Sequence, residues 1–372
     1  MTARERLLAV FNGEEPDYIP WSPLVDYYFL SSIGEDGESE KDIIKASREL
    51  GFDLMERHVP TYSEPFGGSM KIVYKGDVEK NTIREGNKII NRINTPVGNI
   101  EEIRETTEKI KYGFIKEHYL TDMDDVKIYK YILENIEFES LKEEFAERDR
   151  EIGEAGLAVP SGPLTPIQQL LQFLAGVENT IFMVMDNPEE MEELFELIHK
   201  KNKECYQIIF DYPSPLVIAY EDTSTTVISP DMYRQYCKNY IDEYSEIAHK
   251  NDKLFITHMC GTLSQLTGDL AEGKMDGIDS MCPPTSGDLW PYDARKEIGE
   301  EKIIIGGIEP ASLKSLSRQE VREYVIEVLK KMAPGKNFIL SSGDATPHGT
   351  PVENMKEVAK VVREYGKYPL NI

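Results

Sequence analysis

Two side chains that commonly bind metal ions stand two residues apart in the second half of the chain. His258 and Cys260 end the apolar run KLFITHMC, directly before Gly261. Residues i and i+2 of a β-strand point to the same side, so the imidazole and the thiol are expected to share one face. Zinc prefers Cys sulfur and His nitrogen, and catalytic zinc sites keep one coordination position open. The alternative is a core cysteine beside a hydrogen-bonded histidine, because this spacing alone is a weak motif.

Further candidates end other apolar runs. Cys282 closes the next run, GIDSMCPP, and would reach His258 and Cys260 from a neighbouring strand. Asp344 ends NFILSSGD and offers an oxygen ligand or a general base, or else caps the following loop. Glu221 and Asp222 end PLVIAYED and face opposite ways because they are adjacent. One of these two can therefore reach a site while the other takes a structural role.

The elements that must position these residues follow a repeating pattern. From residue 155 onward, six short apolar runs are each followed by a Gly/Pro/Asp-rich loop and an amphipathic stretch, which is typical of strand–helix units. The runs span 156–162, 215–222, 253–261, 277–284, 302–310 and 337–344, and two earlier runs at 17–26 and 52–60 flank a predicted helix at 40–50. Eight such units, with strands apolar throughout, predict an α/β fold, a closed (β/α)8 TIM barrel. Barrel enzymes carry their chemistry at the carboxyl ends of strands, where the candidates lie.

An insertion at 60–154 separates the second and third predicted strands. Its first part, 70–98, alternates in polarity around Gly-Asp and Glu-Gly-Asn turns and predicts a small antiparallel β-hairpin. The rest predicts one or two exposed acidic helices. We expect one barrel domain over 1–372, with the insertion capping or bordering the active-site mouth.

Composition excludes several classes of protein. The 372 residues include 42 Lys and Arg against 67 Asp and Glu, a formal charge of −25, which disfavours binding to nucleic acid or to anionic membranes. No apolar run approaches the ~20 residues of a membrane span, and no secretory leader is recognisable at the start. The four cysteines, at 205, 237, 260 and 282, are too sparse for a disulfide framework. These features predict a cytoplasmic protein, and the lack of a Gly-rich phosphate loop argues against nucleotide-binding folds.

Several segments, in chain order, resemble the uroporphyrinogen decarboxylase superfamily. They are TARERLLAVFNGEEPDYIPW, GPLTPIQQLLQFLAGVENTIFMVMDNPEEMEELFE, EDTSTTVISPDMYRQY, HMCG, PPTSGDLW, IIIGGIEP and SSGDATPHGTPVENM. Within the superfamily, the chain is most similar to cobamide-dependent methyltransferases, and this implies a (β/α)8 enzyme that moves methyl groups to or from a corrinoid. Authentic decarboxylases carry an Arg-Gln-Ala-Gly-Arg-Tyr stretch where this chain has WSPLVDYYF. The missing arginines argue against a polycarboxylate substrate, which needs paired cations.

The same resemblance implies a zinc site. The methyltransferase branch typically binds zinc through His-x-Cys and a later Cys on the last strand. His258 and Cys260 match the first two positions, but Asp344 or its neighbours stand where the later Cys would be. The third ligand therefore stays open: we favour Cys282 by geometry, and Asp344 or Glu221 could complete or replace it.

The function implied is a zinc-dependent methyltransfer from a small methylated substrate, most simply an O-methyl ether, to the cobalt of a separate corrinoid protein. Asp344, Glu221 and Asp222 are the candidate catalytic residues. Three alternatives remain: a methylcobamide:thiol methyltransferase, a metal-free uroporphyrinogen decarboxylase-like lyase, and a non-catalytic barrel. The sequence does not fix the methyl donor or the direction of transfer, and a homo-oligomer stays open.

Overall fold

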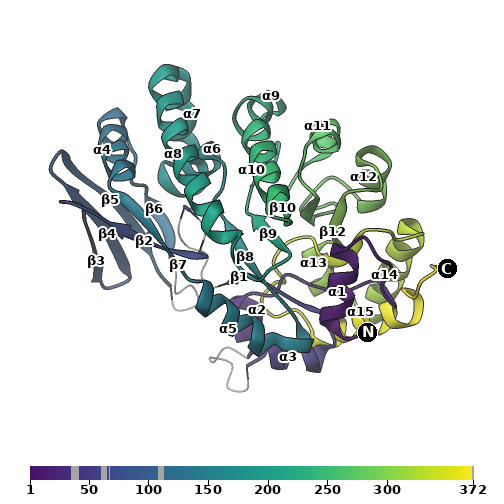
Figure 1. Ribbon diagram of the computed structural model, residues 1–372. Coiled ribbons are helices and arrows are strands. Elements are labelled where there is room, and N and C mark those ends of the chain that lie inside the picture. Colours follow the sequence, from purple (N-terminus) through teal and green to yellow (C-terminus); the bar gives the residue numbers. More distant parts are fainter. Residues whose placement is uncertain (35–41, 60–64, 67, 108–112, 371–372) are drawn as a thin grey trace.

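The computed structural model describes residues 1–34, 42–59, 65–66, 68–107 and 113–370 (Figure 1). Within these ranges the largest sheet has seven parallel strands in the order β1–β8–β9–β10–β11–β12–β13. The strands are β1 (Leu54–Val59), β8 (Gly156–Gly162), β9 (Leu216–Ala219), β10 (Leu254–His258), β11 (Gly277–Met281), β12 (Ile303–Ile308) and β13 (Phe338–Ser342). The sheet curls, and helices cover its outer face. The fold is therefore α/β and resembles a TIM barrel.

The predicted first strand, 17–26, does not form as a regular strand, so the prediction of eight regular strands was wrong at this position. Trp21 makes a single parallel bridge to Leu340 of β13, and the Leu340 N–H donates to the carbonyl oxygen of Pro20 (2.9 Å). Pro20 and Pro23 have no N–H to donate, so this segment cannot continue a hydrogen-bonded ladder. The segment runs along the edge strand β13 with an irregular backbone.

The interior of the curled sheet is apolar, and the first helix packs against it. Helix α1 (Ala3–Phe11) begins with a capping box at Thr2 and buries Leu7, Val10 and Phe11. These three side chains form one cluster with inward-facing strand residues: Met55, Leu157, Val159, Leu216, Ile218, Tyr220, Ile256, Ile303, Ile305 and Ile339. The cluster includes the first residues of β9 and β12, so α1 covers the amino-terminal end of the sheet.

A buried ion pair joins α1 to the edges of the sheet. Arg6 Nη1 lies 2.5 Å from Asp53 Oδ1, and both side chains are about 5% exposed. Asp53 Oδ2 accepts the backbone N–H of Trp21 (3.1 Å), and the Asp53 N–H donates to the Trp21 carbonyl (2.7 Å). Arg6 also binds Asp17 and lies 3.7 Å above the centre of the Tyr18 ring. The irregular segment is thereby attached to the residue that precedes β1, as well as to β13.

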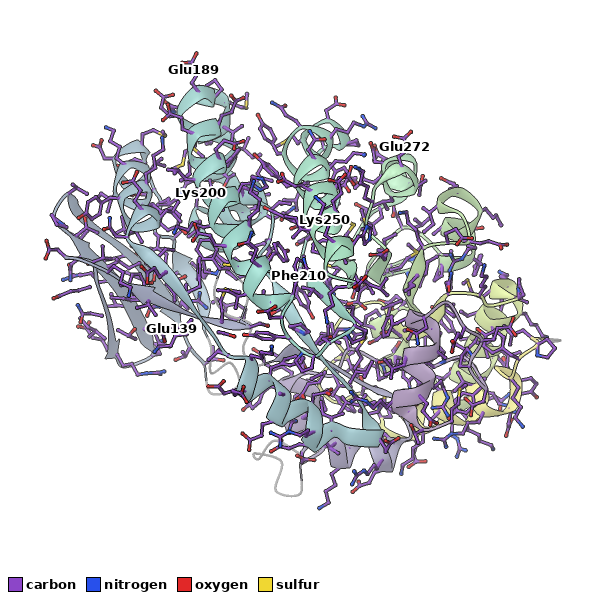
Figure 2. All side chains as sticks on the ribbon, in the orientation of Figure 1. Glu139, Glu189, Lys200, Phe210, Lys250 and Glu272 are labelled. Atoms are coloured by element: carbon purple, nitrogen blue, oxygen red, sulfur yellow. The ribbon has the colours of Figure 1, made fainter. Side chains whose placement is uncertain are left out.

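Amphipathic helices surround the sheet, and Figure 1 shows several of them arranged along its outer side. The bounds are α2 (Tyr27–Ser32), α3 (Ile43–Leu50), α6 (Pro166–Gln169), η2 (Leu170–Leu174), α7 (Gly176–Asp186), α8 (Pro188–Ile209), α9 (Pro230–Tyr233), η3 (Arg234–Lys238), α10 (Asn239–Lys250), η4 (Ser264–Leu266), α11 (Thr267–Glu272), α12 (Pro291–Ile298), α13 (Pro310–Ser315), α14 (Arg318–Met332) and α15 (Val352–Tyr365). In α8, residues at helical spacing are buried, while Glu189 projects at its outer end (Figure 2). None of the helices in the described ranges is both long and apolar enough to cross a membrane.

The insertion contains more β-structure than the single hairpin that the sequence predicts. A four-stranded antiparallel sheet has the order β3 (Glu79–Glu85), β4 (Lys88–Thr95), β5 (Gly98–Glu105) and β6 (Phe114–Glu117), and β2 (Met70–Tyr74) pairs with β7 (Ile136–Ser140). Two helices, α4 (Met123–Glu134) and α5 (Lys142–Ile152), and the short η1 (Gly153–Ala155) complete it. Residues 60–64, 67 and 108–112 of the insertion lie outside the described residues. The antiparallel sheet lies at one side of the molecule, next to α4 (Figure 1).

We predict that Arg6→Met lowers the free energy of unfolding by about 3–5 kcal/mol, because it leaves the Asp53 carboxylate buried without its partner. Urea denaturation followed by circular dichroism measures the change. Lys127→Met is the matched control, because it removes an ion pair with Asp124 in which both side chains are exposed, and it should leave stability unchanged within error. Equal stability of the two variants would contradict the structural role given to the Arg6–Asp53 pair.

Candidate active site

The imidazole of His258 lies at the carboxyl end of β10 and is held from both neighbouring strands. Its Nδ1 is 2.8 Å from Oδ2 of Asp279, which stands opposite it in register on β11. On the other side, the ring of Tyr220 packs against the imidazole, with ring centres 4.6 Å apart. His258 is 6% exposed. The ring therefore has a fixed position above the apolar interior.

Arg57, which the sequence analysis did not single out, completes this polar layer. Its Nη2 lies 3.1 Å from Asp279 Oδ1, and its guanidinium group also donates to the carbonyl oxygens of Ser22 (3.3 Å) and Pro23 (3.4 Å). Although burial acts to raise it, the charge of Arg57 and the hydrogen bond from His258 hold the pKa of Asp279 below its ordinary value. Because Arg and Asp are almost never fully buried unless paired, their presence inside the apolar runs FDLMERHVP and GIDSMC was the signal that could have found them.

Cys260 and Asp222 contact each other just beyond the carboxyl ends of β10 and β9. The Cys260 thiol lies 3.8 Å from Asp222 Oδ1. Burial raises the pKa of Cys260, and the nearby carboxylates of Asp222 and Asp344 raise it further. Burial also raises the pKa of Asp222; Asp344 adds to this, whereas the thiol and His258 act to lower it. Asp222 is thus within electrostatic reach of His258, Cys260 and Asp344.

Asp344 and Cys282 lie on the β11–β13 side of the site. Asp344 follows β13, and its Oδ1 accepts the N–H of Ala345 (2.7 Å). The Cys282 sulfur is 3.5 Å from the carbonyl oxygen of Pro283 and packs against Gly343, where an added Cβ would come within 2.7 Å of it. Burial, with Glu309 and Asp344 nearby, raises the pKa of Cys282 to about 12. Cys282 is therefore a buried thiol beside the loop that carries Asp344.

Glu221 faces away from the residues around His258. It is fully buried, and its two carboxylate oxygens accept the backbone N–H (2.5 Å) and the hydroxyl (2.7 Å) of Thr165, in the loop after β8. Burial raises the pKa of Glu221 to about 7, against the effect of these hydrogen bonds. Of the adjacent carboxylates, Asp222 faces the candidate site and Glu221 anchors a loop, the structural role that the sequence analysis left to one of the pair.

The side chains at the candidate site are of the chemical types that bind zinc, but they do not surround one common point. Among the residues that the structure describes, no three His, Cys, Asp or Glu side chains are placed so that they could hold a metal ion together. His258, Cys260 and Asp222 nevertheless provide an imidazole, a thiol and a carboxylate, the three ligand types that zinc accepts. Asp279 takes Nδ1 of His258, so Nε2 is the nitrogen available to a ligand. Binding an ion would require these side chains to move closer together.

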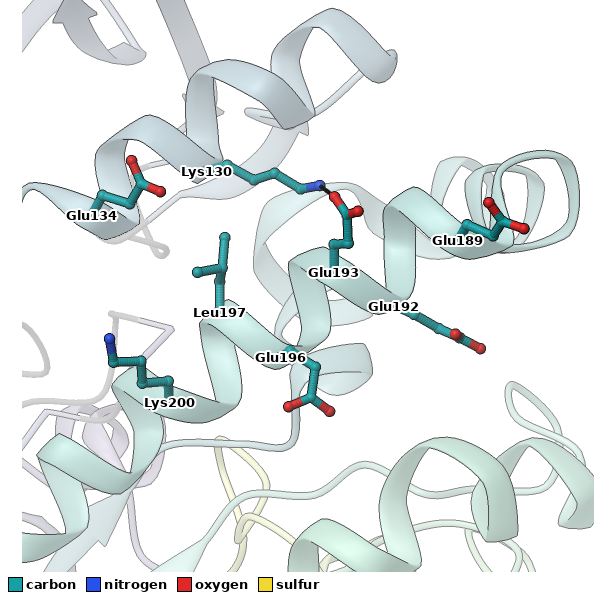
Figure 3. Close-up of a pocket in the computed structure, with 8 residues that line it drawn as sticks. All are labelled: Lys130, Glu134, Glu189, Glu192, Glu193, Glu196, Leu197 and Lys200. Atoms are coloured by element: carbon teal, nitrogen blue, oxygen red, sulfur yellow. Dashed lines mark hydrogen bonds and ion pairs between the residues drawn. The ribbon is translucent and has the colours of Figure 1, made fainter.

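A separate groove lies between α4 and α8 (Figure 3). Its volume is about 780 Å³. Charged side chains dominate its lining, which comprises Lys130, Glu134, Glu189, Glu192, Glu193, Glu196, Leu197 and Lys200. Lys130 and Glu193 form an ion pair of 2.8 Å across it. It contains none of the predicted site residues, so we assign the site to the strand ends instead.

Comparison with known proteins supports the sequence resemblance. The model of the family described as "Uroporphyrinogen decarboxylase (URO-D)" matches residues 100–365. A uroporphyrinogen decarboxylase from Rickettsia canadensis is 31% identical over 77 residues, which are 21% of this chain and only 22% of that protein. The solved structure of a methyltransferase from Methanosarcina mazei superposes with a TM-score of 0.64 at 14% identity, covering 98% of this chain and 99% of the other, and so shares the fold. The chain belongs to the uroporphyrinogen decarboxylase family.

Proposed function

We propose that this protein is a zinc-dependent methyltransferase that takes a methyl group from a small O-methyl ether and passes it to the cobalt of a corrinoid protein. The observation that carries the proposal is the placement of His258, Cys260 and Asp222 at the carboxyl ends of the adjacent strands β9 and β10, with the Cys260 thiol 3.8 Å from Asp222 Oδ1. Barrel enzymes carry their chemistry at this end of the strands. The fold shared with a protein named as a methyltransferase supports the same class of reaction.

The charge of the site favours a methylated substrate over a porphyrinogen. A polycarboxylate needs accessible cations, but Arg57 is fully buried and already paired with Asp279. The polar side chains at these strand ends are instead the thiol of Cys260 and the carboxyl group of Asp222, and neither offers the cation that an anionic substrate needs. A neutral ether has no such requirement. The same argument disfavours the decarboxylase-like lyase.

His258 and Cys260 would hold the zinc ion, with a third ligand from Cys282, Asp222 or Asp344. When bound, zinc would act as a Lewis acid on the ether oxygen. Asp279 keeps the His258 ring in place, and the packed Tyr220 ring limits its rotation. When the methyl group leaves, the ether oxygen keeps the bonding electron pair and then needs a proton. Asp222, whose pKa is raised by burial, is the carboxyl group placed to supply it.

We further propose that the insertion borders the mouth and that the corrinoid protein docks there. The Gly68 N–H donates to Ser161 Oγ (3.2 Å), and the Ser161 N–H donates to Ser69 Oγ (2.9 Å). Ser161 is close to the carboxyl end of β8. These bonds attach the start of the insertion to the end of the sheet that carries the site.

Zinc content is the first prediction of this proposal. Elemental analysis of the purified protein should give about one zinc per chain, as expected for a mononuclear site. The double variant His258→Ala/Cys260→Ser should lose the metal. The control, His249→Gln/Cys205→Ala, changes one histidine and one cysteine on the helical layer, away from the strand ends, and should keep it. An equal zinc content per chain in the two double variants would show that His258 and Cys260 are not zinc ligands.

The third ligand can be identified by comparing single variants. We expect Cys282→Ser to lower zinc affinity by about 10-fold or more, and Asp344→Asn to keep zinc but slow turnover. Competition with a chelating dye measures the affinity. Asp222→Asn is the third arm, because its carboxylate is the one in contact with Cys260. Zinc lost from either Asp variant but retained in Cys282→Ser would make the ligand set His, Cys and carboxylate.

Single-turnover methylation tests the reaction itself. Mixing the zinc-loaded protein with a reduced corrinoid protein and a panel of aryl methyl ethers, methyl thiols and methylamines should methylate cobalt with an ether, and the visible absorption of the corrinoid reports the change. Methylation only by a thiol or an amine would contradict the ether assignment. Transfer only in reverse, from methylcobamide to a thiol, would favour the alternative thiol methyltransferase.

A further inference from the structure

We infer that Arg57 and Asp279 are positioning residues that hold His258 in the tautomer protonated on Nδ1, so that the Nε2 lone pair is presented to the mouth. The proposed function is needed only to say what Nε2 then binds. The tautomer itself is a property of this chain without metal or substrate.

The tautomer of His258 follows from its hydrogen bond with Asp279. Nδ1 and Oδ2 are 2.8 Å apart, and Asp279 is 1% exposed. An ionised carboxylate can only accept hydrogen bonds. Nδ1 must therefore carry the proton, and in the neutral ring Nε2 is then the acceptor.

Arg57 fixes the orientation of Asp279. The guanidinium group forms an ion pair of 3.1 Å with Oδ1 of Asp279, although this oxygen has no hydrogen-bond partner among the described residues, and the pairing leaves Oδ2 to accept from His258. Arg57 is itself held by the carbonyl oxygens of Ser22 and Pro23. The order of the groups thus runs from backbone carbonyls through Arg57 and Asp279 to the imidazole. Reversing the tautomer would require a donor where the structure places a carboxylate oxygen.

A second buried histidine provides an internal contrast. In His199, Nε2 is the nitrogen that faces a carboxylate, 2.8 Å from Glu243 Oε2, while Nδ1 lies 2.9 Å from the hydroxyl of Tyr244. By the same reasoning, neutral His199 carries its proton on Nε2. Among the described residues, His199 and His258 are thus buried histidines of opposite expected tautomer, and one spectrum can compare them.

The test is two-dimensional ¹H–¹⁵N NMR of the metal-free protein labelled with ¹⁵N-histidine, at about pH 8.5, where an ordinary imidazole is neutral. Peak patterns of the ring nitrogens distinguish the two tautomers. His258→Gln and His199→Gln assign the resonances. We expect protonated Nδ1 at His258 and protonated Nε2 at His199. A His258 ring protonated on Nε2, or one that exchanges between the two forms, would overturn the inference.

Asp279→Asn sharpens the test. Arg57 should pair with the amide oxygen of Asn, so the amide NH₂ group points toward Nδ1 of His258. Because NH₂ is a donor, Nδ1 must then accept, and the proton of the imidazole moves to Nε2. Adding Arg57→Met frees the amide to rotate and should restore the Nδ1 proton. Glu243→Gln is the matched control, because it changes the carboxylate beside His199 and should leave the His258 signals in place. Unchanged His258 signals in a folded Asp279→Asn protein would contradict the role of the pair.

Zinc binding separates this inference from the proposed function. Asp279→Asn should weaken zinc affinity about 10- to 100-fold, as loss of a partner of a ligating histidine does. A wild-type protein with the expected tautomer but no zinc would refute the zinc site and leave the inference standing. Zinc bound by a protein with the opposite tautomer would refute the inference and leave the zinc site standing. If Asp279→Asn fails to fold, the wild-type tautomer still decides.

Discussion

A guanidinium group buried inside the sheet is the constraint on which the site depends. The charge of Arg57 must be paired there, because an uncompensated buried charge costs several kcal/mol. The pairing draws on the irregular segment through Ser22 and Pro23, and on β11 through Asp279. Asp279 in turn fixes His258 on β10. One cation on β1 thus links the irregular segment near the start of the chain to the consecutive strands β10 and β11, far along the sequence.

The prolines that prevent a regular eighth strand also leave a backbone carbonyl group free to bind Arg57. A complete ladder would use the carbonyl groups of that segment for strand pairing. Here Pro20 and Pro23 interrupt the ladder, and the carbonyl of Pro23 accepts from Arg57 instead. The attachment lost at the strand is supplied by side chains, chiefly the Arg6–Asp53 pair. The departure from a regular barrel is therefore coupled to the polar layer above the core.

The polarity of the site does not suit the porphyrinogen substrate of the decarboxylases after which the family is named. The carboxyl group of Asp222 and the thiol of Cys260 are partly buried at the strand ends, and the buried cation Arg57 is neutralised by Asp279. Such a site attracts a cation or a neutral molecule and disfavours polyanions. Zinc would satisfy the thiol and carboxyl groups together, which explains why the metal is the central part of the proposed function.

The sequence by itself determined the strand–helix order and the place of the chemistry, because apolar runs and the loops that end them are local signals. The positions of His258, Cys260 and Asp222 at strand ends followed from those runs. Only the tertiary structure decided which polar groups pair inside the sheet, since Arg57 and Asp279 are 222 residues apart and their contact depends on how the sheet curls. The tertiary structure also decided which way the Cys282 side chain points, which is toward Gly343. Ser280 has a φ of 67°, and the pairing of β11 with β12 shifts between Ile278 and Met281, so simple alternation along this strand fails before it reaches the cysteine.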